Sequence, residues 1–306
     1  MKKSIKFLII LLLCFSITNS FIITTFAKSD SEVYLSLDSK NENILPVNFR
    51  KTTELSKLNG TKVNLTGLSD LNISGSSQFT ALSFLKLKED IKTKLPFVDI
   101  DLRQESHGFI NGNAVSWVGY GNKANIGLSL EEAIQKENAQ LSNIPFGKSI
   151  SLDNGKYNLV PTVVENEEKL ITPNNTKYLR LAVTDGNRPT DDIVDMFVNY
   201  ATTQAKGKWL HFHCKAGEGR TTTFMTLYDM LNNSKNVSLE DIVNRQFILG
   251  GINLLKAGDE SKRVDFIKNF YTYTKENDDN FKTTWSQWIK KNNIPPYTLQ
   301  DELPKK

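Results

Sequence analysis

The sequence predicts an α/β fold in which a central, largely parallel sheet is flanked by helices. From residue 176 onward, short apolar runs typical of strands alternate with segments whose apolar residues recur at helical spacing. The composition supports a packed core, because 39% of the residues are hydrophobic and 24% are charged, as in ordinary globular domains. Residues 144–175 contain strand-like runs separated by turn residues and predict a small β-rich insert.

The first 27 residues predict a secretory signal peptide. Three lysines precede the apolar run Phe7–Phe15, and Thr25 and Ala27 place small residues at the usual cleavage offsets. We therefore expect a secreted, extracytoplasmic protein with no stable membrane association after cleavage. An uncleaved anchor is the alternative, because the apolar character continues through Phe21–Phe26.

The net charge does not favour a nucleic-acid partner. The whole chain carries 38 Lys and Arg against 34 Asp and Glu, a formal charge of +4. Three of the lysines lie in the signal segment, which has no acidic residue, so the rest of the chain is nearly neutral. Binding to nucleic acid is therefore not expected.

The N-terminal part of the predicted domain, residues 28–143, has few regular patterns. The expected elements are an extended lead-in with short strands at most over Ser29–Thr66, a turn-rich loop over Ser69–Ser77, a helix from Phe79 through Lys94, a buried strand over Phe97–Leu102 and a helix over Leu128–Leu141. Ser129 and Glu132 form a capping pattern for the last of these.

The later elements follow more clearly. In the insert, residues 144–175, strands are expected at Ser149–Leu152, Tyr157–Val164 and Lys169–Thr172, with a hairpin turn at Asp153–Gly155. The C-terminal part, residues 176–295, is expected to contain strands at Tyr178–Val183 and Trp209–His213. Five helices are also expected there: one capped by Thr190, one over Arg220–Leu231, one capped by Ser238, one over Val264–Tyr273 and one over Trp285–Ile289. Residues 296–306 are expected to be a tail.

The chemically most informative stretch is His213–Thr223, which reads HCKAGEGRTTT. The chain has two cysteines, and Cys14 lies in the signal segment. After cleavage Cys214 can form no internal disulfide, so it is either a buried bystander or a nucleophile.

The loop between the predicted strand and helix is suited to hold a phosphate group. Its glycines permit a tight turn, and the backbone amides of a turn that enters a helix face inward at the positive end of the helix dipole. The residues expected to form this cradle are Lys215, Ala216, Gly217, Glu218 and Gly219.

The residues around the cradle fit nucleophilic catalysis. Arg220 offers a planar fork for two phosphate oxygens, and the same positive field favours Cys214 as a thiolate that attacks phosphorus. Thr221 can donate a hydroxyl to the departing sulfur, and His213 can orient the loop by hydrogen bonding.

This pattern of a cysteine, five residues, an arginine and a threonine resembles the signature of the protein tyrosine phosphatase superfamily. The resemblance implies a protein-tyrosine-phosphatase-like core, a phosphocysteine intermediate and an Asp general acid on an upstream loop. Asp185, 29 residues before Cys214, is the candidate. Asp191 and Asp192 are the alternatives, although acids in a first helical turn are also explained by the helix dipole.

Further motifs resemble the bacterial PTP-like phytases, which dephosphorylate myo-inositol hexakisphosphate. They occur in matching order between about residues 45 and 290, at Asn48–Arg50, Val98–Trp117, Thr184–Pro189, Arg245–Gly251 and Thr284–Trp288. The resemblance implies stepwise hydrolysis of inositol polyphosphates and a partial β-barrel that agrees with the β-rich insert. The chain departs from it at Gly186, where many members have His, and at Arg188, where an aromatic residue is common.

A polyphosphorylated substrate requires cations beyond the cradle. Their positions in the motifs favour Arg50 and Lys215 as substrate-binding cations. The further candidates are Arg188, Lys256, Lys262 and Arg263, and for each of these the alternative is an ordinary surface charge. A second group comprises Arg103, Glu105 and His107. We expect these residues to support the site from beneath, and direct contact with the substrate is the alternative.

The interpretation that follows is a secreted cysteine phosphatase acting on inositol phosphates. No cofactor and no metal are expected, because the three histidines and the remaining cysteine lack ligand spacing. An exported protein tyrosine, dual-specificity or phosphoinositide phosphatase is the first alternative. A phosphate-binding module without activity is the second.

Overall fold

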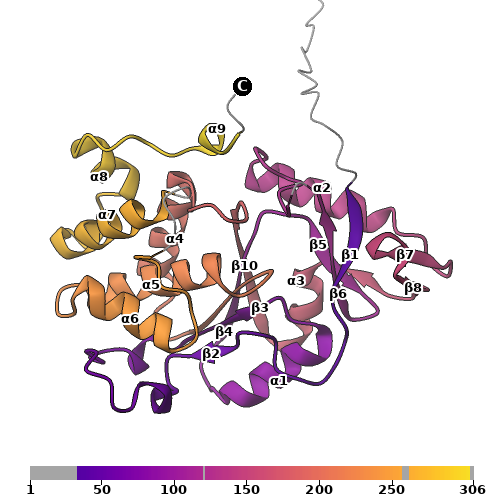
Figure 1. The fold of residues 1–306 in the computed structure, drawn as a ribbon, viewed down its shortest axis with the longest axis horizontal. Helices are drawn as coiled ribbons and strands as arrows, with labels where there is room; N and C mark the ends of the chain where they lie inside the picture. Colours follow the sequence, from indigo (N-terminus) through magenta and orange to yellow (C-terminus); the bar gives the residue numbers. More distant parts are fainter. Residues whose placement is uncertain (1–32, 120, 257–261, 304–306) are drawn as a thin grey trace, which may run out of the picture. The chain divides into compact units, whose positions relative to one another are not determined.

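The computed structural model describes residues 33–119, 121–256 and 262–303 (Figure 1). The predicted signal peptide lies outside these residues. The described residues form one compact unit, and the segment 144–175 is part of it.

The central sheet has five strands, and the four longest are parallel. Its order is β10 (Thr176–Val183), β4 (Phe97–Arg103), β11 (Trp209–Cys214), β3 (Ile73–Ser77) and β2 (Arg50–Lys51). Only β2 is antiparallel to its neighbour. The predicted α/β class with a largely parallel sheet is therefore confirmed.

Strand β3 is a correction to the sequence analysis, which predicted a loop over Ser69–Ser77. Only Ser69–Leu71 forms a turn, and Ile73–Ser77 is a fully buried strand between β11 and β2. Its small residues suit this place, because a Cβ at Gly75 would lie 2.6 Å from the sulfur of Met225. Close packing against the helix that carries Met225 outweighs the weak strand propensity of these residues.

A second sheet is antiparallel and open among the described residues. Its order is β1 (Tyr34–Ser39), β6 (Asn113–Val118), β5 (His107–Ile110) and β9 (Val164–Glu165). The predicted hairpin is present as β7 (Ile150–Leu152) and β8 (Tyr157–Leu159). Because β9 pairs with β5, the residues of the predicted insert complete this second sheet and do not close a barrel of their own.

The third strand predicted in the insert, Lys169–Thr172, is wrong. Residues Glu167–Ile171 form the short helix α3. The side chain of Asn166 accepts a hydrogen bond from the amide of Lys169, and Glu167 and Glu168 occupy the first turn. N-capping and the helix dipole therefore favour a helix here.

Eight further helices are described. They are α1 (Ala81–Ile91), α2 (Leu130–Ser142), α4 (Asp191–Thr203), α5 (Gly219–Asn233), α6 (Leu239–Ile248), α7 (Arg263–Glu276), α8 (Trp285–Lys291) and α9 (Leu299–Glu302). The predicted caps at Ser129 and Ser238 are confirmed. Thr190 is the N-cap residue of α4, but its side chain makes no capping hydrogen bond. Figure 1 shows α4 to α8 gathered on the side away from α1.

The two faces of β4 differ in chemistry, because successive side chains of a strand alternate. Val98, Ile100 and Leu102 join the main core with residues of α4 to α8. The odd-numbered Asp99 and Asp101 are fully buried on the other face, where α1 and α3 pack. This polar face meets the end of β11, where His213 Nε2 lies 3.6 Å from Asp99 Oδ2.

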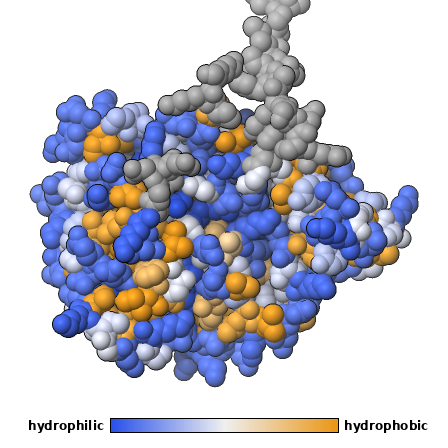
Figure 2. Space-filling model, viewed as in Figure 1, coloured by the Kyte–Doolittle hydropathy of each residue, from blue (hydrophilic) through white to orange (hydrophobic). Residues whose placement is uncertain are grey.

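The surface is mostly hydrophilic in the view of Figure 2, and hydrophobic residues gather over α6 and α1. Phe247 of α6 and Leu82 and Leu85 of α1 are exposed. Among the described residues, no helix combines the length and the apolarity that crossing a bilayer requires.

Candidate active site

The loop from Cys214 to Arg220 joins the end of β11 to the start of α5. Its carbonyl groups point outward, where they accept hydrogen bonds from three residues in two segments of the chain. The carbonyl of Lys215 accepts from the amide of Gln78 at 3.2 Å, that of Ala216 from Asn48 Nδ2 at 2.8 Å, and that of Gly217 from Arg50 Nη1 at 2.8 Å. Each carbonyl and the following amide point in opposite directions because the peptide is planar. The amides of this loop are therefore free to face an anion at the start of α5.

Gly217 is required at its position for two reasons. Its φ of +74° lies in the left-handed region that side chains rarely adopt. A Cβ there would also lie 2.3 Å from the backbone nitrogen of Ser77 and 2.4 Å from the carbonyl carbon of Ser76. The loop is thus pressed against the end of β3, the strand that the sequence analysis missed.

Cys214 is 3% exposed, and its sulfur accepts two hydrogen bonds. They come from the amide of Gly217 at 3.3 Å and from the hydroxyl of Thr221 at 3.2 Å. Burial by itself raises the pKa of the thiol, but the charge of Arg220 and these hydrogen bonds more than offset it, so the pKa of Cys214 lies below its usual 9.0. A thiol held this way is a ready nucleophile.

Arg220 is oriented by a carboxylate far away in the sequence. Its Nη1 and Nη2 donate to Glu105 Oε2 and Oε1 at 2.7 and 2.9 Å, and Nη1 also donates to the carbonyl of Val183 at 2.9 Å. Burial raises the pKa of Glu105, but the charges of Arg220 and Arg103 lower it well below its usual range. Glu105 is therefore an ionised partner that holds Arg220 in place from beneath the loop.

Asp185 lies in the loop after β10, beside Arg220. Its Oδ1 is 3.1 Å from Arg220 Nη2, and its Oδ2 accepts a hydrogen bond from Asn122 Nδ2 at 3.0 Å. The side chain is 38% exposed, so it is accessible from the open side of the site. Asn122 carried no recognisable signal in the sequence.

The two alternative acids lie elsewhere. Asp191 is buried at the start of α4, where it accepts from Trp285 Nε1 at 2.8 Å and from the amide of Tyr297 at 2.6 Å. Asp192 is exposed on the same turn and lines a cavity of about 790 Å³ with residues 293–300. Neither Cys214 nor Arg220 lines that cavity, so the geometry supports Asp185 as the acid.

Of the cations predicted to bind substrate, Arg50 and Arg188 are buried and make their contacts within the protein. Arg50 is 1% exposed and supports the loop from below, with Nη2 donating to Thr222 Oγ1 at 3.1 Å in addition to the Gly217 carbonyl. The Arg188 guanidinium lies 4.5 Å from the ring centres of both Phe266 and Tyr297 and is paired with Asp191. Both are positioned as structural supports.

The other predicted binding residues lie nearer to solvent. The amine of Lys215 is 3.0 Å from Asp38 Oδ1 and 3.1 Å from Ser116 Oγ, and its side chain is 28% exposed. Glu218 lies at the N-terminus of α5, 3.5 Å from Asn48 Nδ2. Lys256 is exposed. Asp38, which holds Lys215 in place, was not recognised in the sequence.

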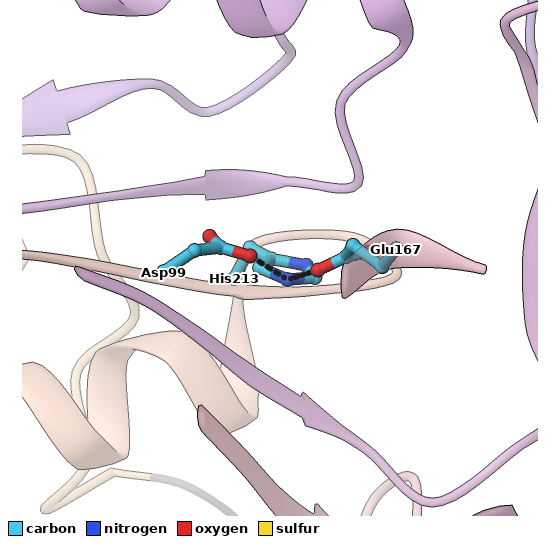
Figure 3. A group of neighbouring side chains, drawn as sticks. All are labelled: Asp99, Glu167 and His213. Carbon is cyan, nitrogen blue, oxygen red and sulfur yellow. Dashed lines mark hydrogen bonds and ion pairs between the residues drawn. The ribbon is translucent and has the colours of Figure 1, made fainter. Parts of the chain in front are cut away.

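His213 anchors the strand end from which Cys214 projects. Its Nε2 lies 2.6 Å from Glu167 Oε1 and 3.6 Å from Asp99 Oδ2 (Figure 3). Burial lowers the pKa of His213, but both carboxylates outweigh burial, and the pKa is raised well above 6.5. Glu167 also accepts from Gln78 Nε2 at 2.7 Å, which links this pair to the loop. His213 therefore orients the loop through Glu167 and Gln78.

Asp99, Glu167 and His213 also have the spacing of a possible metal site, since their ligand atoms all lie within 4.8 Å of one another. A second such group consists of Asp101, His107 and Glu167. Burial lowers the pKa of His107, but Asp101 and Glu137 raise it to about 9. Because these carboxylates raise the pKa of both imidazoles, we interpret the cluster as an internal ion-pair network.

The fold and this site together define a class of protein. A buried thiol with a lowered pKa, at the carboxyl end of a parallel strand and next to an arginine and an accessible aspartate, is the arrangement of a cysteine-dependent phosphatase of the protein-tyrosine-phosphatase-like fold.

Comparison with known proteins identifies the family. The model of the PTP-like phytase family, whose description reads "Inositol hexakisphosphate", matches residues 150–232. The structure of a PTP-like phytase from Bdellovibrio bacteriovorus is similar with a TM-score of 0.71 and 32% identity, over 85% of this chain and 95% of that chain. The chain therefore belongs to the PTP-like phytase family, as the resemblance of its motifs predicted.

Two further relatives are longer than this chain. The PTP-like myo-inositol phosphatase from Mitsuokella multacida, in complex with myo-inositol-(1,3,4,5)-tetrakisphosphate, is similar with a TM-score of 0.76 and 35% identity, over 86% of this chain and 50% of that chain. Effector protein hopD2 from Pseudomonas syringae pv. tomato is 31% identical over 264 residues, 78% of this chain and 56% of its own length. The chain thus spans about half the length of both.

Proposed function

We propose that this protein removes phosphate groups stepwise from inositol polyphosphates through a phosphocysteine intermediate, outside the cytoplasm. The observation that carries the proposal is the convergence of Cys214, Arg220 and Asp185. Arg220 Nη2 is 3.1 Å from Asp185, and the charge of Arg220 lowers the pKa of Cys214.

Arg220 also retains a free donor. Its Nε is buried and has no hydrogen-bond partner among the described residues. A buried donor without a partner is costly, and a phosphoryl oxygen in the cradle would satisfy it. The planar guanidinium then places Nε and one Nη on the phosphoryl group while Glu105 holds the other edge.

The first chemical step transfers the phosphoryl group to sulfur. The Cys214 thiolate attacks phosphorus, the bond between phosphorus and the ester oxygen breaks, and protonated Asp185 gives its proton to the leaving oxygen. The loop amides and Arg220 stabilise the charge on the equatorial oxygens. The products are an alcohol and phosphocysteine.

The second step restores the enzyme. Asp185, now ionised, takes a proton from a water molecule, whose oxygen attacks phosphorus and breaks the bond to sulfur. The departing thiolate is stabilised by the Thr221 hydroxyl and the Gly217 amide, which contact the sulfur at 3.2 and 3.3 Å. Inorganic phosphate leaves, and neither step requires a metal.

Two comparisons support an inositol phosphate as substrate. The family model carries that description, and the Mitsuokella relative is a complex with an inositol tetrakisphosphate. A second candidate is a phosphatase that acts on phosphoproteins, which is favoured by the similarity to a protein described as an effector. The thiolate chemistry would be the same in both.

The test is phosphate release by residues 28–306, kept reduced, from inositol hexakisphosphate and from a phosphotyrosyl peptide in parallel. Cys214→Ser is the blank. A preference for the inositol phosphate supports the proposal, and a preference for the peptide supports the second candidate. No release from either substrate would contradict both and leave a phosphate-binding module.

Export is tested separately, by sequencing the N-terminus of the protein recovered from its producing cells. A new N-terminus at Lys28 outside the cytoplasm supports cleavage of the segment 1–27. Retention of that segment in a membrane fraction supports an anchor, and recovery of the full chain in the cytoplasm contradicts export.

A further inference from the structure

Arg263, the first residue of α7, contacts the loop that carries Asp185. Its Nη2 donates to the carbonyl of Gly186 at 3.2 Å and to that of Asn187 at 3.0 Å. These are the two residues directly after Asp185. A single guanidinium nitrogen thus holds the backbone on which the acid's position depends.

The same guanidinium lies against the phosphate-binding loop. A Cβ built on Gly219 would be 3.5 Å from both Nη atoms of Arg263 and 3.7 Å from its Cζ. Gly219 is the residue between Glu218 and Arg220, at the start of α5. Arg263 therefore bridges the loop that carries the acid and the loop that carries the nucleophile.

Among the described residues, Arg263 lacks the carboxylate partner that a buried arginine with a purely structural role usually has. It is 6% exposed, and within the described parts of the chain it has no carboxylate at ion-pair distance. Burial and the charge of Arg220 lower its pKa, and the charges of Asp185 and Cys214 act in the opposite direction. Its charge is thus compensated by the site itself.

The acid loop needs such a support. Gly186 adopts a φ of +80°, and Asp185 is 38% exposed. The ends of the loop are fixed separately, because Thr184 Oγ1 donates to Gln104 Oε1 at 2.6 Å and Arg188 is held between two rings. Between these ends, the contacts to the carbonyls of residues 186 and 187 come from Arg263.

We propose that Arg263 is a positioning residue for the general acid, which holds the backbone after Asp185 so that the carboxyl group faces the leaving oxygen above Cys214. The inference rests on the proposed phosphatase function. It predicts that loss of Arg263 harms protonation of the leaving group more than attack by the thiolate.

The experiment compares two monophosphate esters that differ in their leaving groups. Phenyl phosphate needs protonation of its leaving oxygen, whereas dinitrophenyl phosphate leaves as a stable anion and does not. In Arg263→Gln, kcat/KM, which reports the steps up to formation of phosphocysteine, is expected to fall by about 30-fold for phenyl phosphate, less than the roughly 10²–10⁴-fold contribution of a whole general acid, and by less than about threefold for dinitrophenyl phosphate. Arg263→Lys, which keeps a cation and one donor, should recover part of the loss.

The control is Lys268→Gln, which removes an exposed cation from the same helix and should leave both rates unchanged. Equal loss on both esters in Arg263→Gln would overturn the inference, and so would no loss on either. Loss confined to inositol hexakisphosphate would also overturn it, because Arg263 would then bind a distal phosphate. A parent protein inactive on every ester would instead refute the proposed function, and this inference with it.

Discussion

Substitution of Glu105 gives the strongest test of how the residues of the site are held in place. Its carboxylate contacts Arg220 at 2.7 and 2.9 Å and Arg103 Nε at 2.8 Å, and all three side chains are at most 1% exposed. Glu105→Gln keeps the shape of the side chain but removes the charge. Two buried guanidiniums then lose their shared anion.

The expected loss of stability is large. Removing one partner of a buried ion pair costs about 3–5 kcal/mol. A loss of 1 kcal/mol lowers the thermal midpoint by about 2–4 °C in proteins of this size. The midpoint of Glu105→Gln should therefore fall by roughly 6–20 °C, as measured by thermal denaturation followed by circular dichroism at neutral pH.

The pH dependence gives a second readout. Because the pKa of Glu105 lies well below 4.5, the folded state gains stability from the ionised group above the unfolded pKa and loses it as the pH falls through the folded pKa. The difference in the free energy of unfolding between the parent protein and Glu105→Gln should thus be constant from neutral pH to about pH 5 and become smaller only in stronger acid.

The control variant is Glu89→Gln, which removes the same charge from an exposed pair with Lys86. Its midpoint should match that of the parent protein, since exposed ion pairs contribute little. A midpoint of Glu105→Gln close to that of the control would refute the reasoning, because the two arginines would then be compensated by other groups.

Three further predictions concern the chemistry. Asp185→Asn should lower kcat/KM for inositol hexakisphosphate by about a hundredfold or more and leave kcat/KM for dinitrophenyl phosphate nearly unchanged; equal losses on both, or no loss on either, would contradict the role of Asp185 as the acid. Thr221→Val removes a hydrogen bond that lowers the pKa of Cys214, so the profile of iodoacetamide alkylation against pH should move to higher pH, and an unmoved profile would contradict the role of the hydroxyl. Gly217→Ala should abolish phosphate release, because the new Cβ meets the backbone of Ser76 and Ser77. Gly207→Ala, with a similar φ of +73° and nothing within 4 Å, should keep full activity despite the same backbone strain.

Much of the fold and the catalytic loop could be predicted from the sequence, because they depend on neighbours along the chain. The alternation of strand and helix patterns predicted the parallel sheet, and Ser129 and Ser238 predicted two helix starts. The loop between Cys214 and Arg220 is equally local, since its glycines, its length and the helix that follows define an anion cradle. Asp185 was predicted because the family resemblance implies an acid on a loop upstream of the cysteine, and Asp185 lies 29 residues before Cys214.

The sequence was less informative where packing decided the outcome. Ile73–Ser77 has the composition of a loop, yet it is a central strand because small residues let α5 approach the sheet. Arg50 and Arg188 have the appearance of substrate-binding cations in the sequence. Only the structure shows that the first supports the loop carbonyls and the second lies between two aromatic rings.

The sequence by itself determined which groups can perform the chemistry, the thiol, the guanidinium and the carboxyl group, because their reactivity belongs to their residue types and to the turn that presents them. The tertiary structure decided which charges hold those groups in place. Glu105 lies 115 residues before Arg220 and Glu167 lies 46 residues before His213. Such pairs form only when particular strands become neighbours, and a charged residue has the same letter whether the fold buries it or leaves it in water.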